Sequence, residues 1–345
     1  MKQNCRTYIF LYILFFFVII GGAYTVYLHF DYTTVPDMRS YMKMAEGNFQ
    51  VNLIHRYRPI VPLLAKLVSL PISEVYTYLW PHRPESDWPL RLGFLIVNSS
   101  ILALAALLIF RTCRAYGILP FTALLVVFFI LISRCALYIS GLPRVDSLYF
   151  LIFALTLYGL KVNSKPALIF SILVGPFAKE SFIFLAPLIF FWGKIDKKIQ
   201  IALFALAGAL VLGMRYGIDQ LVGTDQTENL SIAFLHLHNL SYTLFRIFSI
   251  RGIGELFSVF GVLYLILFIG FTGGKRERKK WTAYLDVPVN GLLIVVVLHM
   301  FLSGDIGRMS FLAAPALAVI CGLILDRHSF FIPIKKFMGE KGNDQ

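Results

Sequence analysis

Long apolar segments alternate with short polar ones along almost the whole chain. The first apolar segment covers about 8–28 and matches the ~20 residues that an α-helix needs to cross the hydrocarbon core of a bilayer. Further segments of this kind cover about 89–110, 118–137, 147–160, 200–218, 253–271, 287–302 and 309–325. No internal repeat or long polar domain separates them. The pattern predicts an all-α polytopic membrane protein whose single transmembrane domain covers residues 1–345.

Residues 166–192 allow two interpretations. A single helix would place Lys161 and Lys165 on the opposite side of the membrane from Lys197, which conflicts with the tendency of basic residues to stay in the cytoplasm. A hairpin of two short helices that turns near Lys179 keeps these lysines on one side. Counted as two crossings, the hairpin gives about ten membrane-spanning helices with both chain termini in the cytoplasm.

The composition excludes a soluble protein of this length, because 58% of the 345 residues are hydrophobic and only 15% are charged. The formal net charge of +13 would suit a nucleic-acid partner, but its densest group, at 275–280, is short and lies between two apolar segments. Such groups are typical of cytoplasmic loops, so no nucleic-acid partner is expected. The short loops favour a multi-pass protein of the plasma membrane, in a bacterial inner membrane.

Two longer polar segments are expected on the outer side of the membrane: the first extracytoplasmic loop, 30–88, and the second, 219–252. Residues 326–345 form the predicted cytoplasmic tail. The topology brings charged residues from four separate outer loops to one face, where function is expected. They are Asp31, Asp37, Arg39, Lys43, Arg56, Arg58, Arg144, Asp146, Lys179, Glu180, Asp305 and Arg308.

The first outer loop predicts two amphipathic helices that lie along the membrane surface. Pro36 suits a helix start and Gly47 suits its end. Asp37 and Tyr41 are four residues apart, so they share one face of this helix. A second interfacial helix is expected after Pro59, with several leucines on its apolar side.

A carboxylate at the membrane surface next to arginine and lysine has a specific chemical use. The carboxylate can activate a hydroxyl or an amine, while the cations hold a phosphate leaving group. This arrangement suits a donor in which a sugar is linked to a lipid phosphate.

The order of these features resembles the GT-C glycosyltransferases, in particular the protein O-mannosyltransferases and the bacterial lipid A aminoarabinose transferases. In those families the first outer loop begins with an Asp that is followed four residues later by a Tyr, as Asp37 and Tyr41 are here. Met38 stands where the families usually have a second acidic residue. Five further segments match in order, at 58–64, 89–92, 144–146, 178–180 and 308–315.

The resemblance implies inverting transfer of a hexosyl or pentosyl group from a polyprenyl-phosphate donor to an acceptor at the extracytoplasmic face. Asp37 would act as the base or orient the acceptor, and Asp31 is the rival carboxylate. The donor phosphate would be bound by Arg58, Lys179, Arg308 and Arg56. The supporting residues would be Tyr41, His55, Arg144, Asp146 and Glu180. No cofactor is implied, and no cluster of side chains requires a divalent metal.

The acceptor is a lipid, a glycan or a protein, and membrane lipids surround the chain. Two other classes of protein share some of these features. A polymerase or ligase of lipid-linked glycans would use arginines of the second outer loop, here Arg246 and Arg251. A transporter of lipid-linked sugars would have related halves or charges near the middle of the membrane, whereas most charges here collect at one face.

Overall fold

The computed structural model describes residues 5–83, 86–223 and 239–333, and these residues form helices and connecting segments without any strand. Four helices are long and apolar enough to cross a membrane. They are α1 (Cys5–His29), α4 (Ile60–Leu79), α5 (Trp88–Ala115) and α11 (Lys197–Val222). Three bent helix pairs raise this number to seven if each pair is counted as one span. The chain is therefore all-helical with several apolar helices, while the total of about ten spans stays a prediction.

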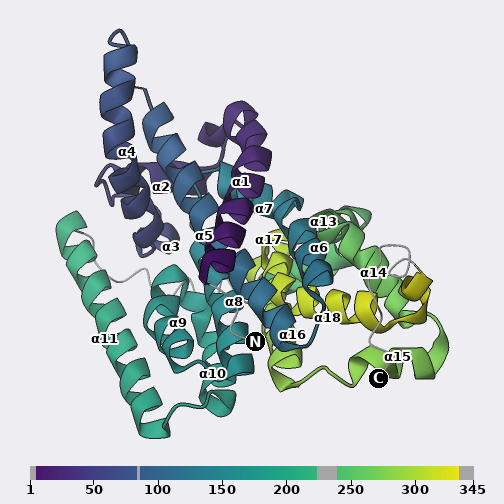
Figure 1. Ribbon diagram of the computed structural model, residues 1–345. Helices are drawn as coiled ribbons and strands as arrows, with labels where there is room; N and C mark the ends of the chain where they lie inside the picture. Colours follow the sequence, from purple (N-terminus) through teal and green to yellow (C-terminus); the bar gives the residue numbers. More distant parts are fainter. Residues whose placement is uncertain (1–4, 84–85, 224–238, 334–345) are drawn as a thin grey trace.

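The other helices are shorter and connect or flank these four (Figure 1). They are η1 (Tyr32–Thr34), α2 (Pro36–Ala45), α3 (Leu53–Arg56), α6 (Pro120–Leu131), α7 (Arg134–Gly141), α8 (Asp146–Val162), α9 (Lys165–Ala178), η2 (Glu180–Phe184), α10 (Ala186–Trp192), α13 (Ile250–Phe260), α14 (Val262–Phe271), α15 (Gly274–Thr282), α16 (Val287–Ser303), α17 (Ile306–Phe311), α18 (Ala314–Arg327) and η4 (Ser329–Phe331).

Helix α5 is the most buried of the four long helices. In its most apolar stretch 67% of the residues are buried, against 11% for α11. Small residues allow this close packing: a Cβ atom on Gly93 of α5 would lie 2.4 Å from the carbonyl oxygen of Ala65 in α4. Gly141 of α7 makes a similar approach to Ala23 of α1, where an added Cβ would lie 2.7 Å from the carbonyl oxygen. Because α5 also packs against α1 and α7, these four helices form one group.

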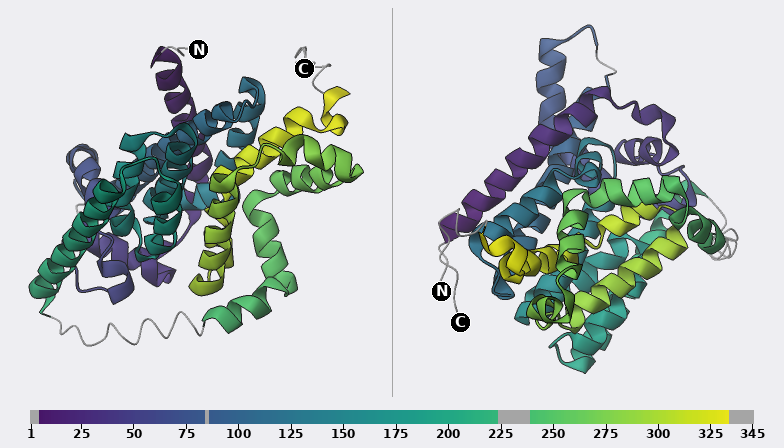
Figure 2. Two further views of the ribbon diagram at one scale, coloured as in Figure 1. Left: turned by 90° about the horizontal axis from the view of Figure 1, so that it is seen from below. Right: turned by 90° about the vertical axis from the view of Figure 1, so that its right-hand side faces the viewer.

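Three groups of helices are visible in Figure 1. The helices of the first third of the chain lie at the top, α9, α10 and α11 lie at the lower left, and α13, α14, α15 and α18 lie on the right, with α16 and α17 nearer the centre. Figure 2 shows that α11 stays at the edge of the molecule when it is viewed from below. Because α11 exposes apolar side chains along most of its length, this helix is suited to face lipid.

Two of the predicted spans bend sharply. The span predicted for 253–271 is not one straight helix, because α13 and α14 meet at 97°. Gly261 lies at the break with φ of +44°, a region of backbone conformation that disfavours other residues, and hydrophobic pattern alone does not reveal it. The segment predicted as one span at 118–137 is likewise divided into α6 and α7, which meet at 60°. Ser133 accepts a hydrogen bond from the Ala136 amide at the start of α7.

Residues 166–192 are divided into two short apolar helices, as the hairpin interpretation predicts, while two membrane crossings stay a prediction. Helix α9 ends at Ala178, and the chain continues through η2 into α10. An added Cβ on Gly193, just after α10, would lie 3.3 Å from Leu168 near the start of α9, so α10 returns alongside α9. Lys179 is therefore at the turn of the hairpin.

The first outer loop contains the short helix expected after Pro36, and α2 ends at Ala45 with Gly47 in the left-handed region. The helix after Pro59 is longer than a surface helix requires, because α4 has 20 residues and is apolar enough to span. Residues 224–238 of the predicted second outer loop lie outside the described residues, as do residues 334–345 of the predicted tail.

Candidate functional site

Helix α2 places Asp37 at its first turn. Pro36 occupies the first position of the helix, where its missing N–H leaves no intrahelical bond unmade, and a carboxylate in this turn is favoured by the helix dipole. Met38 and Tyr41 are buried beneath the helix. Met38 therefore belongs to the core, at the position where the resembling families usually carry a second acid. Asp37, which is half-buried, is therefore the acidic residue of α2.

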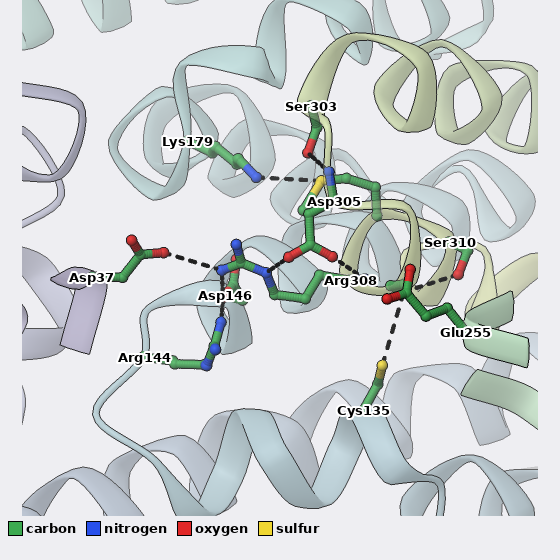
Figure 3. A network of polar contacts seen from close by, with 12 residues as sticks. Asp37, Cys135, Arg144, Asp146, Lys179, Glu255, Ser303, Asp305, Arg308 and Ser310 are labelled. Atoms are coloured by element: carbon green, nitrogen blue, oxygen red, sulfur yellow. Dashed lines mark hydrogen bonds and ion pairs between the residues drawn. The ribbon is translucent and has the colours of Figure 1, made fainter. Parts of the chain in front are cut away.

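Asp37 lies between a histidine and an arginine. The Nε2 atom of His55 lies 3.2 Å from one carboxylate oxygen. Nη1 of Arg308 lies 3.5 Å from the other, as Figure 3 shows. The hydrogen bond from His55 lowers the pKa of Asp37 far below its usual range; burial acts in the opposite direction, and the charge of Arg308 lowers the pKa further. Asp37 is therefore an ionised carboxylate at neutral pH.

Arg308 joins three parts of the chain. Its Nη1 atom lies 3.5 Å from Asp146 at the start of α8 as well as from Asp37, and its Nε donates to Asp305 (Figure 3). The Asp305 carboxylate also accepts a hydrogen bond from the Arg308 amide and so caps α17. The charge of Arg308 thus has carboxylates from α2, α8 and the α16–α17 turn around it.

The segment between α7 and α8 brings Arg144 and Asp146 to the same place. Nη1 of Arg144 lies 3.8 Å from the Asp146 carboxylate. Asn98 of α5 is fully buried, donates hydrogen bonds to the carbonyl oxygens of Leu142 and Arg144, and accepts one from Ser147. Asn98 therefore fixes this segment, because a buried amide that lost these partners would be costly.

The turn of the hairpin supplies a second group of charges. Glu180 accepts a hydrogen bond of 2.8 Å from Arg58 and lies 3.6 Å from Arg215 of α11. The Nζ atom of Lys179 lies 3.3 Å from the sulfur of Met309 and above the ring of Tyr149. Burial lowers the pKa of Lys179 to about 8, while nearby Asp146 acts in the opposite direction. Lys179 is thus a half-buried cation whose charge is lost at mildly alkaline pH.

The structure thus brings nine of the eleven predicted site residues into one region. They are Asp37, Tyr41, His55, Arg58, Arg144, Asp146, Lys179, Glu180 and Arg308. Their roles in binding and catalysis stay predictions.

Asp31 and Arg56 have other contacts. Asp31 is exposed and caps η1, where it accepts hydrogen bonds from the amide and the hydroxyl of Thr33, and these bonds lower its pKa. Arg56 is buried and forms an ion pair of 3.3 Å with Asp219 of α11. The hydroxyl of Tyr57 donates to the same carboxylate at 2.7 Å. Arg56 therefore attaches the first outer loop to α11.

Asp219 and Arg215 were not predicted as part of the site, and Asp305 was expected only on the same outer face. Asp219 and Arg215 lie four residues apart near the end of α11, and this pair of charges in an apolar helix was a usable signal. Asp305 lies three residues before Arg308 in a polar turn, a spacing that suits a helix cap.

No three His, Cys, Asp or Glu side chains gather as candidate metal ligands within the described ranges. The carboxylates of the site are paired with Arg58, Arg308 and His55 instead. An arrangement of ionised carboxylate and surplus cations can orient a hydroxyl or amine and bind an anion.

No protein-family model, curated protein or solved structure matches this chain. The resemblance to GT-C glycosyltransferases therefore depends on the residues and spacings of the chain itself. Of those residues, Asp37 and Asp146 meet at Arg308.

Proposed function

We propose that the protein is a membrane glycosyltransferase that moves a sugar from a polyprenyl-phosphate donor to an acceptor at the extracytoplasmic face. One observation carries the proposal. Asp37 contacts Arg308, and Arg308 also contacts Asp146, which Arg144 approaches to 3.8 Å. Lys179 and Arg58 lie close enough to Asp146 to lower its pKa, against the effect of burial. An acceptor group and a leaving phosphate need such neighbouring anionic and cationic partners.

The acceptor is oriented by Asp37. A strong general base has a pKa near the working pH, whereas His55 and Arg308 keep the pKa of Asp37 far below it. An ionised carboxylate still accepts a hydrogen bond from a hydroxyl or amine and aligns it for attack. Of the two roles expected for Asp37, orientation of the acceptor therefore has the stronger support.

The donor phosphate is bound by Arg58 and Lys179, with Arg308 beside them. The side chain of Arg58 is 11% exposed and its Nε atom is buried without a hydrogen-bond partner among the described residues. Lys179 contacts sulfur and an aromatic ring, and no carboxylate in the described parts of the chain lies within ion-pair distance of it. Both cations thus retain capacity for an added anion.

A transfer assay tests the proposal. The purified protein in liposomes receives a labelled polyprenyl-phosphate sugar, and the appearance of label in an acceptor fraction is measured. The Asp37→Asn and Asp37→Ala variants are expected to lose about 10²-fold in rate, the loss typical of a misaligned reacting group. Glu46→Gln serves as the matched control, because Glu46 is an exposed carboxylate just after α2.

The alternative functions give different results in the same assay. Full activity in both Asp37 variants, with loss in Arg246→Ala, would contradict the proposal and favour a polymerase. Movement of labelled lipid across the liposome without any transfer would favour a transporter.

A further inference from the structure

A cavity of about 230 Å³ lies on the other side of Arg308 from Asp37. Helices α7 and α13 and the turn before α17 form its walls, and Figure 3 shows Asp37 on one side of Arg308 and Glu255 and Cys135 on the other. Its lining combines charged residues with a tyrosine and apolar side chains. The residues that matter here are Arg134, Arg144, Arg308, Glu255, Asp305 and Tyr138.

The two carboxylates of the cavity are already paired. Glu255 accepts a hydrogen bond of 3.0 Å from Nε of Arg246, and a second one from the same guanidinium. Asp305 pairs with Arg308 and caps α17. Neither acid is therefore available to neutralise the remaining arginines.

The arginines of the cavity keep unused donors. The Nε and Nη1 atoms of Arg144 are buried and donate no hydrogen bond within the described ranges, and the 3.8 Å to Asp146 is too long for one. Arg134 donates one hydrogen bond of 3.1 Å, to Ser258, out of the five that a guanidinium can make. Buried donors without partners favour an anion, and the planar guanidinium suits a carboxylate or a phosphate.

The size of the cavity limits the ligand. Pockets for drug-sized molecules are roughly 300–1,000 Å³, so a cavity of about 230 Å³ holds a smaller group such as one sugar ring. Tyr138 contributes an aromatic surface, and the guanidinium of Arg134 lies 5.5 Å from the centre of its ring.

We infer that this cavity binds the acidic part of the acceptor, a single sugar ring that carries a carboxylate or a phosphate. The role as acceptor rests on the proposed function, whereas the binding of an acidic sugar does not. Arg144 and Arg134 bind the acidic group, and the ring extends toward Arg308, which lies 3.5 Å from Asp37. The site thus selects acidic acceptors over neutral ones.

Cys135 provides a direct probe, because its half-buried thiol lines the cavity while Cys113 and Cys321 are buried elsewhere. In a Cys5→Ser background, labelling of Cys135 by a maleimide is measured with glucuronic acid, glucose 6-phosphate, inorganic phosphate or glucose present. Glucuronic acid and glucose 6-phosphate are expected to slow labelling at least several-fold, and glucose is not. If inorganic phosphate also slows labelling, the site binds any phosphate. If it does not, binding requires the sugar ring.

Thermal unfolding gives a second measurement that does not depend on thiol reactivity. A ligand of the native state raises the midpoint of unfolding, so the acidic sugars should raise it in the wild type and fail to do so in Arg134→Gln and Arg144→Gln. Arg134 is exposed at the rim, so its variant tests binding even if loss of Arg144 disturbs folding. Arg278→Gln on α15 is the control, because Arg278 donates to the carbonyl of Gly274 in its own helix.

Equal effects of glucose and glucuronic acid, or no effect of either in both measurements, would overturn the inference. If inorganic phosphate alone protected Cys135 from labelling, the conclusion that the cavity binds a whole sugar ring would be wrong. Binding of acidic sugars without activity in the transfer assay would contradict the proposed transferase function but support the binding site. Failure of the proposed function can therefore be distinguished from failure of the binding site.

Discussion

The guanidinium of Arg308 lies 3.5 Å from the carboxylate of Asp37, although 271 residues separate them in the sequence. The same nitrogen lies 3.5 Å from Asp146. Arg308 therefore connects the first outer loop with the start of α8 and with its own turn before α17.

Replacing Arg308 by lysine should reduce kcat/KM about 10²–10³-fold, the usual loss when one stabilising donor is removed from a reaction site. Lysine keeps the positive charge, but its single ammonium nitrogen cannot replace the separate guanidinium nitrogens that contact Asp37, Asp146 and Asp305. Initial rates of transfer measure the effect. Arg278→Lys is the matched control, and equal rates in both variants would show that only charge matters at Arg308.

Replacing His55 by glutamine should shift the acid limb of the pH–rate profile to higher pH. His55 supplies the strongest influence that lowers the pKa of Asp37, so its removal lets that pKa rise toward the ordinary value of about 3.9. The carboxylate would then be protonated, and activity lost, at a higher pH than in the wild type. An acid limb that stays in place in the variant would mean that Asp37 does not limit the rate at low pH.

Lys179 should produce opposite effects of pH on activity and on stability. Its pKa in the folded protein is about 8. Binding of the donor phosphate should weaken as pH rises through that value. In the unfolded chain the lysine keeps its proton up to its ordinary pKa of about 10.4. Between pH 8 and about 10.4 the unfolded chain therefore binds more protons than the folded chain, so the free energy of unfolding rises with pH in this range.

Two variants test the role of Lys179. In Lys179→Arg the alkaline loss of donor affinity should disappear, because arginine stays charged. Lys179→Met should bind donor weakly at every pH. Donor affinity and the unfolding midpoint are measured from pH 7 to 10, and an unchanged alkaline limb in Lys179→Arg would assign that limb to another group.

The buried pair between Arg56 and Asp219 should matter for stability. Both side chains are less than 10% exposed, and breaking such a pair on one side typically costs about 3–5 kcal/mol. We expect this loss in Arg56→Met and a large recovery in Arg56→Met/Asp219→Leu, measured by unfolding in detergent. Lys280→Met breaks the more exposed pair with Glu277 and should cost no more than about 1 kcal/mol. Equal losses in Arg56→Met and Lys280→Met would contradict the structural role.

Local features of this chain could be predicted from its sequence. Pro36 and Gly47 gave the limits of α2 to within two residues, because the backbone conformations of proline and glycine are local properties. Lysines on either side of 166–192 indicated the hairpin, since the placement of positive charge relative to the membrane constrains topology.

Other features depended on tertiary structure. The bend at Gly261 leaves the apolar pattern unchanged, so the sequence predicted a single span there. Arg56 looked equivalent to Arg58 in the sequence, yet one pairs with Asp219 and the other with Glu180. The partner of each arginine is decided by how α11 and the hairpin pack, which no local pattern encodes.

The central claim is that Asp37 orients an acceptor for transfer from a lipid-phosphate sugar. The most direct measurement is the release of labelled polyprenyl phosphate from a polyprenyl-phosphate sugar in liposomes, with an acidic sugar acceptor present. The wild type should release the lipid phosphate, and Asp37→Ala should do so at least about 100-fold more slowly. Equal release by the two proteins would contradict the account.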